Sequence, residues 1–122
     1  MIAGIGTDII EIERVKKAAT PAFLKRVYTE KEQAYCEARR AGKYASYGAR
    51  WAGKEAVLKA FGTGLRGGSL TEIEILPDEL GCPRVSLSGY FKGLAEEQGI
   101  KKVWLSLSHA KDFATAQCVM EK

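Results

Sequence analysis

The 122-residue sequence predicts an α+β fold: one small domain, residues 1–122, with helices packed against a central, largely antiparallel sheet. Three observations support this class. Helical patterns are concentrated in the first half of the chain, whereas most strand patterns lie in the second half. The last two strand patterns are separated by four residues, a connection of hairpin length. The proportions of apolar (46%) and charged (28%) residues are those of a globular protein.

The N-terminal half is expected to hold one strand and then helices. Residues 2–10 carry aliphatic side chains on both alternating faces, which predicts a central strand buried on both sides. Thr20 followed by Pro21 is typical of a helix start. The T-E-K-E segment that opens at Thr29 is a capping box, and the helix it begins should run towards Ala41.

The central segment, residues 50–61, has the composition of a helix and ends in a glycine-rich loop over residues 62–68. Alternating patterns then predict strands, and a short amphipathic stretch ending before Gly99 predicts one more helix. The expected strands are 70–76, 84–87, 103–108 and 113–120, the expected helix is 88–98, and residues 109–112 should form the last loop.

Charge and cysteine content narrow the function classes. Nineteen Lys and Arg against 15 Asp and Glu give a net charge of +4, which favours acidic partners such as phosphates, nucleic acid or an acidic protein. The three cysteines are odd in number and far apart, so we expect small buried or half-buried thiols in a reducing cytoplasm, not disulfides or a zinc site. No apolar run of about 18 residues exists, so no membrane span is expected.

Asp8 is the first candidate for chemistry. It stands between Thr7 and Ile9 at the end of an apolar strand, where an unpaired carboxylate is costly to desolvate. Asp8 therefore either caps a turn or binds a cation.

Glu55 is the second candidate. With about 100° per residue, Glu55 falls within an apolar helix face, with Trp51 on one side and small alanines on the other. One explanation is an ion pair with Lys59, four residues later. The other is that Asp8 and Glu55 together bind Mg²⁺, which typically takes one or two protein carboxylates and completes its shell with water and phosphate oxygens.

Several further residues could hold phosphates. Lys59 falls beside Glu55 on the helix, whereas Arg50 and Lys54 fall on another side of it, so that basic residues surround the central acid. The glycines from Gly62 onward follow a helix, so they are not a P-loop, and Gly62 could equally be a C-cap. His109, the only histidine, either has a structural role, or donates a hydrogen bond to a phosphate or acts as an acid or base.

Two segments resemble the signatures of the 4′-phosphopantetheinyl transferases. The first is I-G-T-D at residues 5–8, and the second is W-A-G-K-E-A-V-L-K at residues 51–59, about forty residues later. The S-L-S-H segment at residues 106–109 resembles the small subfamily that acts on acyl carrier protein. The resemblance implies transfer of 4′-phosphopantetheine from coenzyme A to a serine of apo acyl carrier protein, with Mg²⁺ as cofactor, in support of fatty acid biosynthesis. It also implies a homotrimer with active sites between subunits.

The resemblance assigns roles to residues of this chain. Asp8 and Glu55 would hold the metal, and Glu55 and Lys59 would be catalytic. Arg14 and Arg26 would contact the acidic carrier protein. The residues expected to bind coenzyme A are Arg50, Lys54, Lys59, Gly62, Thr63, Gly64, Ser108 and His109.

Three questions stay open at this stage. The base that takes the proton from the carrier serine could be Glu55, Glu32 or a water molecule. A magnesium-dependent phosphohydrolase acting on a nucleotide would use the same residues without the basic carrier surface. A basic nucleic-acid-binding module is disfavoured, because the charge is modest and the aromatic Trp51 and Phe61 lie among apolar helix neighbours.

Overall fold

The computed structural model describes residues 1–122 and confirms the α+β class. The strands are β1 (Ile2–Glu11), β2 (Ile73–Pro77), β3 (Pro83–Leu87), β4 (Lys102–Ala110) and β5 (Phe113–Glu121). The helices are α1 (Ile12–Ala18), α2 (Pro21–Val27), α3 (Glu30–Glu37), α4 (Lys43–Phe61) and α5 (Gly89–Glu97). Single 3₁₀ turns cover Arg40–Gly42 and Leu70–Glu72.

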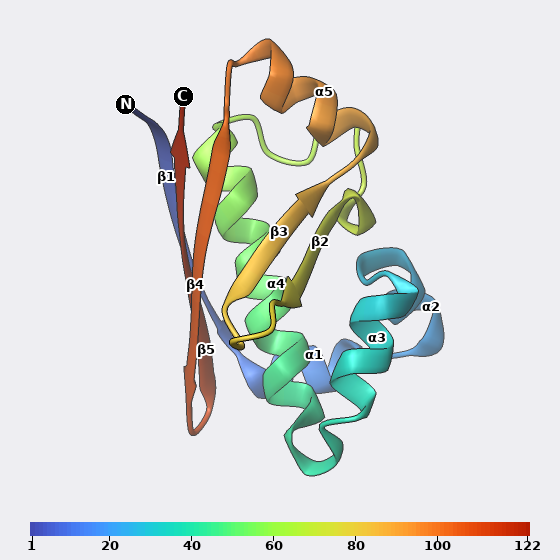
Figure 1. Ribbon diagram of the computed structural model, residues 1–122. Coiled ribbons are helices and arrows are strands. Elements are labelled where there is room, and N and C mark those ends of the chain that lie inside the picture. Colours follow the sequence, from blue (N-terminus) through green and yellow to red (C-terminus); the bar gives the residue numbers. More distant parts are fainter.

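The strands form two antiparallel sheets in place of the one central sheet expected. The first has the order β1-β5-β4, and the second is the β2-β3 hairpin. The long helix α4 lies between them, with α1, α2 and α3 at one end and α5 at the other (Figure 1). Small residues make this arrangement possible. A Cβ added to Gly53 of α4 would come within 2.7 Å of Ile75 on β2 and 3.2 Å of Leu107 on β4.

The predicted helix starts are confirmed. The Thr20 hydroxyl accepts the Phe23 N–H at 3.2 Å, and Pro21 occupies the first turn of α2. At α3 the Thr29 hydroxyl accepts the Glu32 N–H while the Glu32 carboxylate accepts the Thr29 N–H at 2.9 Å. These local hydrogen bonds satisfy backbone groups that the first turn of a helix leaves free.

Two element boundaries differ from the prediction in the first half of the chain. Helix α3 ends at Glu37, well short of Ala41, and Arg40 adopts a left-handed conformation (φ 53°) that a continuous helix does not allow. The charged segment after β1, whose residue pattern did not define an element, forms the short helix α1.

Strand β1 lies at the edge of its sheet, so the prediction of a central strand buried on both sides is wrong. Gly4, Gly6 and Asp8 face α4, whereas Ile5 and Ile9 on the other face are 69% and 62% exposed. Apolar residues on both faces of a strand thus do not show that both faces are covered within one chain.

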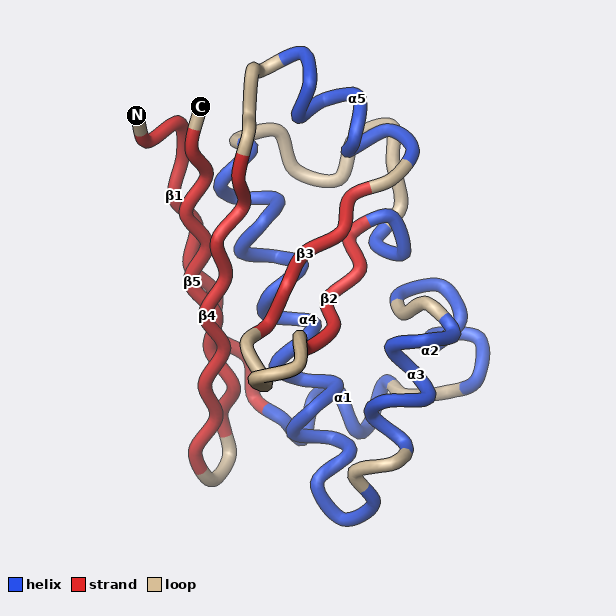
Figure 2. The backbone as a smooth tube through the Cα atoms, viewed as in Figure 1, coloured by secondary structure: helices blue, strands red, loops and turns tan.

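The second half of the chain follows the predicted order of elements with two changes (Figure 2). Residues Leu70–Glu72 form a 3₁₀ turn, so the strand begins only at Ile73. Strand β4 continues through His109 to Ala110, which leaves a two-residue turn before β5 where a four-residue loop was expected.

The three cysteines are free, as expected. Cys36 and Cys118 are buried, but Cys82 is exposed in the β2-β3 turn. None of the helices combines the length and the apolar character needed to cross a bilayer.

Candidate functional site

Asp8, Glu55 and Lys59 come together where β1 meets α4. The Asp8 side chain is 16% exposed and points inward from β1, while Glu55 is half-buried on the facing side of α4. The Lys59 ammonium donates to Asp8 Oδ1 at 3.1 Å and to the Thr7 carbonyl at 3.0 Å. Lys59 therefore pairs with Asp8 across the two elements, and no ion pair joins it to Glu55 within 4.0 Å.

The negative charges of Asp8 and Glu55 repel each other at this site. Burial raises the pKa of Glu55 above its ordinary value, the negative charge of Asp8 raises it further, and Lys59 only partly opposes both effects. No group of three or more acidic, histidine or cysteine side chains suited to a metal forms anywhere in the chain. Asp8 and Glu55 are two carboxylates from different elements, and Mg²⁺ can bind to one or two protein carboxylates when water and phosphate oxygens supply its other ligands.

A cavity of about 400 Å³ opens beside these groups. The residues that line it are Glu55, Leu58, Lys59, Gly62, Gly64 and Leu65. Gly62 has φ 82° and ends α4, with its N–H directed at the carbonyls of Leu58 and Lys59, so it is a helix C-cap as well as a wall of the cavity. Thr63 does not line the cavity.

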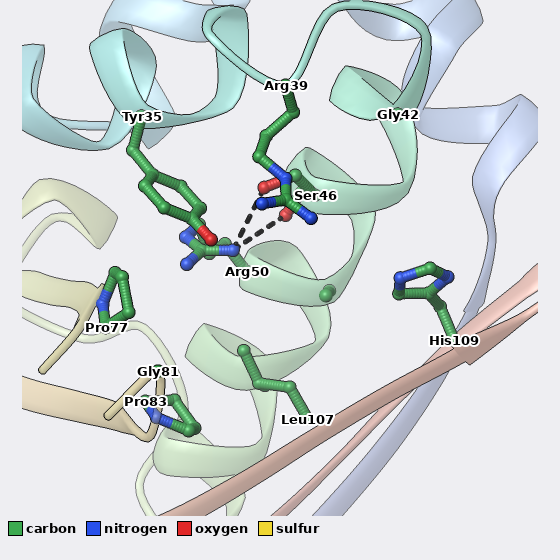
Figure 3. A pocket seen from close by; sticks show the side chains of 11 residues that line it. Tyr35, Arg39, Gly42, Ser46, Arg50, Pro77, Gly81, Pro83, Leu107 and His109 are labelled. Atoms are coloured by element: carbon green, nitrogen blue, oxygen red, sulfur yellow. Dashed lines mark hydrogen bonds between the residues drawn. The ribbon is translucent and has the colours of Figure 1, made fainter. Parts of the chain in front are cut away.

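Arg50 and His109 lie in a second cavity, of about 230 Å³, that shares no lining residue with the first. Figure 3 shows the Arg39 and Arg50 guanidinium groups near Tyr35, with His109 of β4 across the pocket. Arg50 is only 5% exposed; it donates to the Ile75 carbonyl at 3.1 Å and to the Ser46 hydroxyl at 3.1 Å. Its guanidinium also lies 4.4 Å from the centre of the Tyr35 ring. The cavity therefore presents fixed positive charge beside an aromatic face.

Lys54 does not line either cavity, and its expected role in binding coenzyme A is corrected. Its ammonium is fully buried and donates to Glu32 Oε1 at 2.8 Å and to the carbonyls of Leu70 and Ile73 at 2.9 and 2.6 Å. An ammonium has three donors, so none is left for a phosphate. Burial lowers the pKa of Lys54, whereas the adjacent Glu32 carboxylate raises it.

Glu32 is excluded as the general base by the same contacts. Its side chain is fully buried, and beyond Lys54 it accepts the backbone N–H groups of Thr29 and Ile75. No solvent or substrate hydroxyl can reach it, which leaves Glu55 or a water molecule.

The other predicted residues lie apart from the paired carboxylates. Ser108 and His109 are neighbours on β4 and so point to opposite faces of the sheet, and only His109 lines a cavity. Arg14 and Arg26 are exposed on α1 and α2. Arg14 lies at a third cavity, of about 220 Å³, whose walls include the apolar side chains of Phe23 and Trp51.

The sequence reasoning missed most of the wall of the Arg50 cavity, including Tyr35, Arg39, Pro77 and Pro83. One signal was present: Tyr35 and Arg39 are four residues apart, and their side chains interact, with the guanidinium 5.7 Å from the ring centre. The two prolines flank a turn between strands, and no local pattern indicates that this turn meets Arg50.

Comparisons with known proteins identify the family of this chain. The family model of the 4′-phosphopantetheinyl transferase superfamily matches residues 4–118. The holo-[acyl-carrier-protein] synthase of Ruminiclostridium cellulolyticum is 48% identical over 120 residues, which cover 95% of this chain and 90% of that protein. The chain therefore belongs to the 4′-phosphopantetheinyl transferase superfamily.

Solved structures place it more narrowly. The holo-[acyl-carrier-protein] synthase of Neisseria meningitidis aligns with a TM-score of 0.90 at 38% identity, covering 100% of both chains. The enzyme from Bacillus anthracis, in complex with CoA (3′,5′-ADP), aligns with a TM-score of 0.81 at 36% identity and covers 98% of this chain and 96% of that one. Within the superfamily the chain groups with the holo-[acyl-carrier-protein] synthases, which are transferases.

Proposed function

We propose that this protein, as one domain of residues 1–122, transfers 4′-phosphopantetheine from coenzyme A to a serine of apo acyl carrier protein. The reaction uses Mg²⁺, releases adenosine 3′,5′-bisphosphate and supports fatty acid biosynthesis in the cytoplasm. The observation that carries the proposal is the meeting of Asp8 and Glu55 beside Lys59, at a cavity whose wall includes Gly62 and Gly64.

Asp8 and Glu55 are the residues that would hold the metal. A bound Mg²⁺ would neutralise charge on the diphosphate of coenzyme A. Other residues of the chain would bind and position the donor. Lys59, more than half exposed, directs its ammonium at this place and can contact a phosphate oxygen. Gly62 and Gly64 have no side chain and leave room for the donor against the loop.

The Arg50 cavity suits the nucleotide end of coenzyme A. Arg39 and His109 can donate to a phosphate, while Arg50 adds fixed charge and Tyr35 adds an aromatic face. The structure of the B. anthracis enzyme carries CoA (3′,5′-ADP), which supports a nucleotide site in a protein of this fold.

We propose further that the protein is a homotrimer with active sites between subunits, as the family resemblance implies. Within one chain the Glu55 and Arg50 cavities are separate, since they have no lining residue in common. The outer face of the β1-β5-β4 sheet exposes large apolar side chains, among them Ile5, Ile9, Trp104 and Phe113. Such a surface is typical of an interface.

Light scattering tests the trimer. We expect a mass of about three times the 13.3 kDa of one chain. A monomer at micromolar concentration would contradict the shared site.

The carrier protein would bind at α1 and α2. Arg14 and Arg26 supply positive charge for an acidic surface, and the cavity beside Arg14 offers apolar walls from Phe23 and Trp51. A basic rim around an apolar centre is a common design for binding an acidic protein.

The decisive experiment is the mass of apo acyl carrier protein after incubation with this protein, coenzyme A and Mg²⁺. We expect a mass gain of one phosphopantetheine and none when Mg²⁺ is chelated. The variant Arg14→Glu should raise the KM for the carrier roughly fivefold, corresponding to about 1 kcal/mol for a reversed rim charge. Nucleotide breakdown without a mass gain, unaffected by Arg14→Glu, would instead indicate a phosphohydrolase.

A further inference from the structure

The contact between β1 and α4 is unusually close at two glycines. A Cβ added to Gly6 would lie 2.0 Å from the carbonyl oxygen of Ala56, and one added to Gly4 would lie 2.1 Å from that of Ala60. Neither glycine adopts a left-handed conformation, so backbone freedom does not explain them. Space alone requires glycine at these two positions.

The atoms that Gly6 faces cannot move aside. They belong to the backbone of α4, whose carbonyls are held in the hydrogen bonds of the helix, and no side-chain rotation would relieve the clash. Real Cβ atoms essentially never come closer than 3.0 Å to a neighbour, so any side chain at Gly6 would push the strand and the helix apart. Close packing transmits such a displacement to nearby groups.

This contact adjoins the paired carboxylates. Asp8 is the next inward-facing residue after Gly6 on β1, and Ala56 directly follows Glu55 on α4. The Lys59 ammonium bridges the same two elements through Thr7 and Asp8. Gly4 makes the same kind of contact, but one strand repeat further from Asp8.

We propose that Gly6 is a positioning residue: it sets the separation of β1 and α4 at which Asp8 and Glu55 share one divalent cation. This rests on the proposed metal role of the two carboxylates. Magnesium requires near-ideal octahedral geometry with oxygen ligands at about 2.0–2.1 Å. A strand displaced outward would carry the Asp8 carboxylate away from that geometry.

The test is Mn²⁺ binding to the purified protein, measured from the electron paramagnetic resonance of free Mn²⁺ and repeated with coenzyme A present. We expect Gly6→Ala to weaken binding about 10-fold to 100-fold, the range found when residues that orient metal ligands are lost. Gly4→Ala is the matched control, because its added Cβ meets a backbone carbonyl of α4 at nearly the same distance, 2.1 Å against 2.0 Å, but further from Asp8. Its loss of affinity should be clearly smaller. Gly93→Ala, with nothing within 4 Å of the added Cβ, should bind as the parent does.

A second variant tests the distance itself. Asp8→Glu lengthens the carboxylate by one methylene and should weaken Mn²⁺ binding in the parent background, whereas in Gly6→Ala it should restore part of the lost affinity. Gly6→Ala can be accommodated in a folded protein, since β1 is an edge strand that pairs with no strand other than β5. If that variant nevertheless fails to fold, Asp8→Glu alone decides, because unchanged affinity would show that the spacing is not strict.

The outcomes separate this inference from the proposed function. Unchanged Mn²⁺ binding by Gly6→Ala, or equal losses in both glycine variants, would overturn the role of Gly6 and leave the metal assignment intact. A parent protein that binds no Mn²⁺ even with coenzyme A would overturn the metal assignment and this inference with it.

Discussion

Glu55→Gln is expected to lower the rate of phosphopantetheine transfer at least about a hundredfold, because loss even of a residue that supports a metal ligand costs about 10-fold to 100-fold. The amide keeps the size of the side chain but removes one of the two negative charges that would hold Mg²⁺. Initial rates of carrier modification, followed by mass spectrometry over a Mg²⁺ titration, measure the effect.

The same variant should fold as well as the parent or better. Burial and the charge of Asp8 both raise the pKa of Glu55, so its ionised form is disfavoured in the folded protein and a neutral side chain relieves that strain. Activity and thermal stability would then move in opposite directions, which is typical of a functional site. A fully active Glu55→Gln protein would refute the assignment of Glu55.

Lys54→Met is expected to destabilise the protein by about 3–5 kcal/mol, the usual cost of leaving one charge of a buried pair uncompensated. Both side chains of the Lys54–Glu32 pair are fully buried, and the ammonium also satisfies the carbonyls of Leu70 and Ile73. Its removal would leave the Glu32 carboxylate without a cation between α3, α4 and β2. Urea unfolding at a fixed protein concentration, followed by circular dichroism, measures the loss.

The chain contains a matched control for this experiment. Lys43 and Glu37 also join α4 to α3, at 3.2 Å, but their side chains are 32% and 49% exposed. Lys43→Met should leave the unfolding midpoint unchanged within error, because water screens an exposed pair. Adding Glu32→Gln to Lys54→Met should recover part of the stability by removing the unpaired charge. A stable Lys54→Met protein that binds coenzyme A poorly would instead show that Lys54 contributes to coenzyme A binding.

Local features of the fold were predictable because their causes lie within a few residues. The capping box of Thr29 and Glu32 and the Thr20-Pro21 start depend on hydrogen bonds and torsions inside one turn. Helix periodicity likewise separated Glu55 and Lys59 from Arg50 and Lys54 on different sides of α4. Periodicity does not show which element of the fold packs against each side of the helix.

Apart from shifted element boundaries, the errors concern such packing partners. The sequence pattern predicts that Lys54 binds a ligand, but in the folded protein α3 and β2 cover it. Glu32 is a possible base by the sequence alone, but its carboxylate accepts hydrogen bonds from the Lys54 ammonium and the Ile75 N–H. The sequence pattern predicts a central strand at β1, but β1 pairs only with β5, and Ile5 and Ile9 are exposed. In each case long-range packing decides burial, and burial decides the role.

The sequence by itself determined which groups are available for chemistry: two carboxylates in distant segments, a lysine four residues after one of them, and the glycines beyond it. The residue types and their spacing along the chain follow directly from the sequence. The tertiary structure alone decided that Lys59 pairs with Asp8, that Arg50 and His109 share a separate cavity, and that Gly6 brings β1 onto α4. These contacts join residues far apart in the chain, and only the packing of α4 between two sheets brings them within reach of one another.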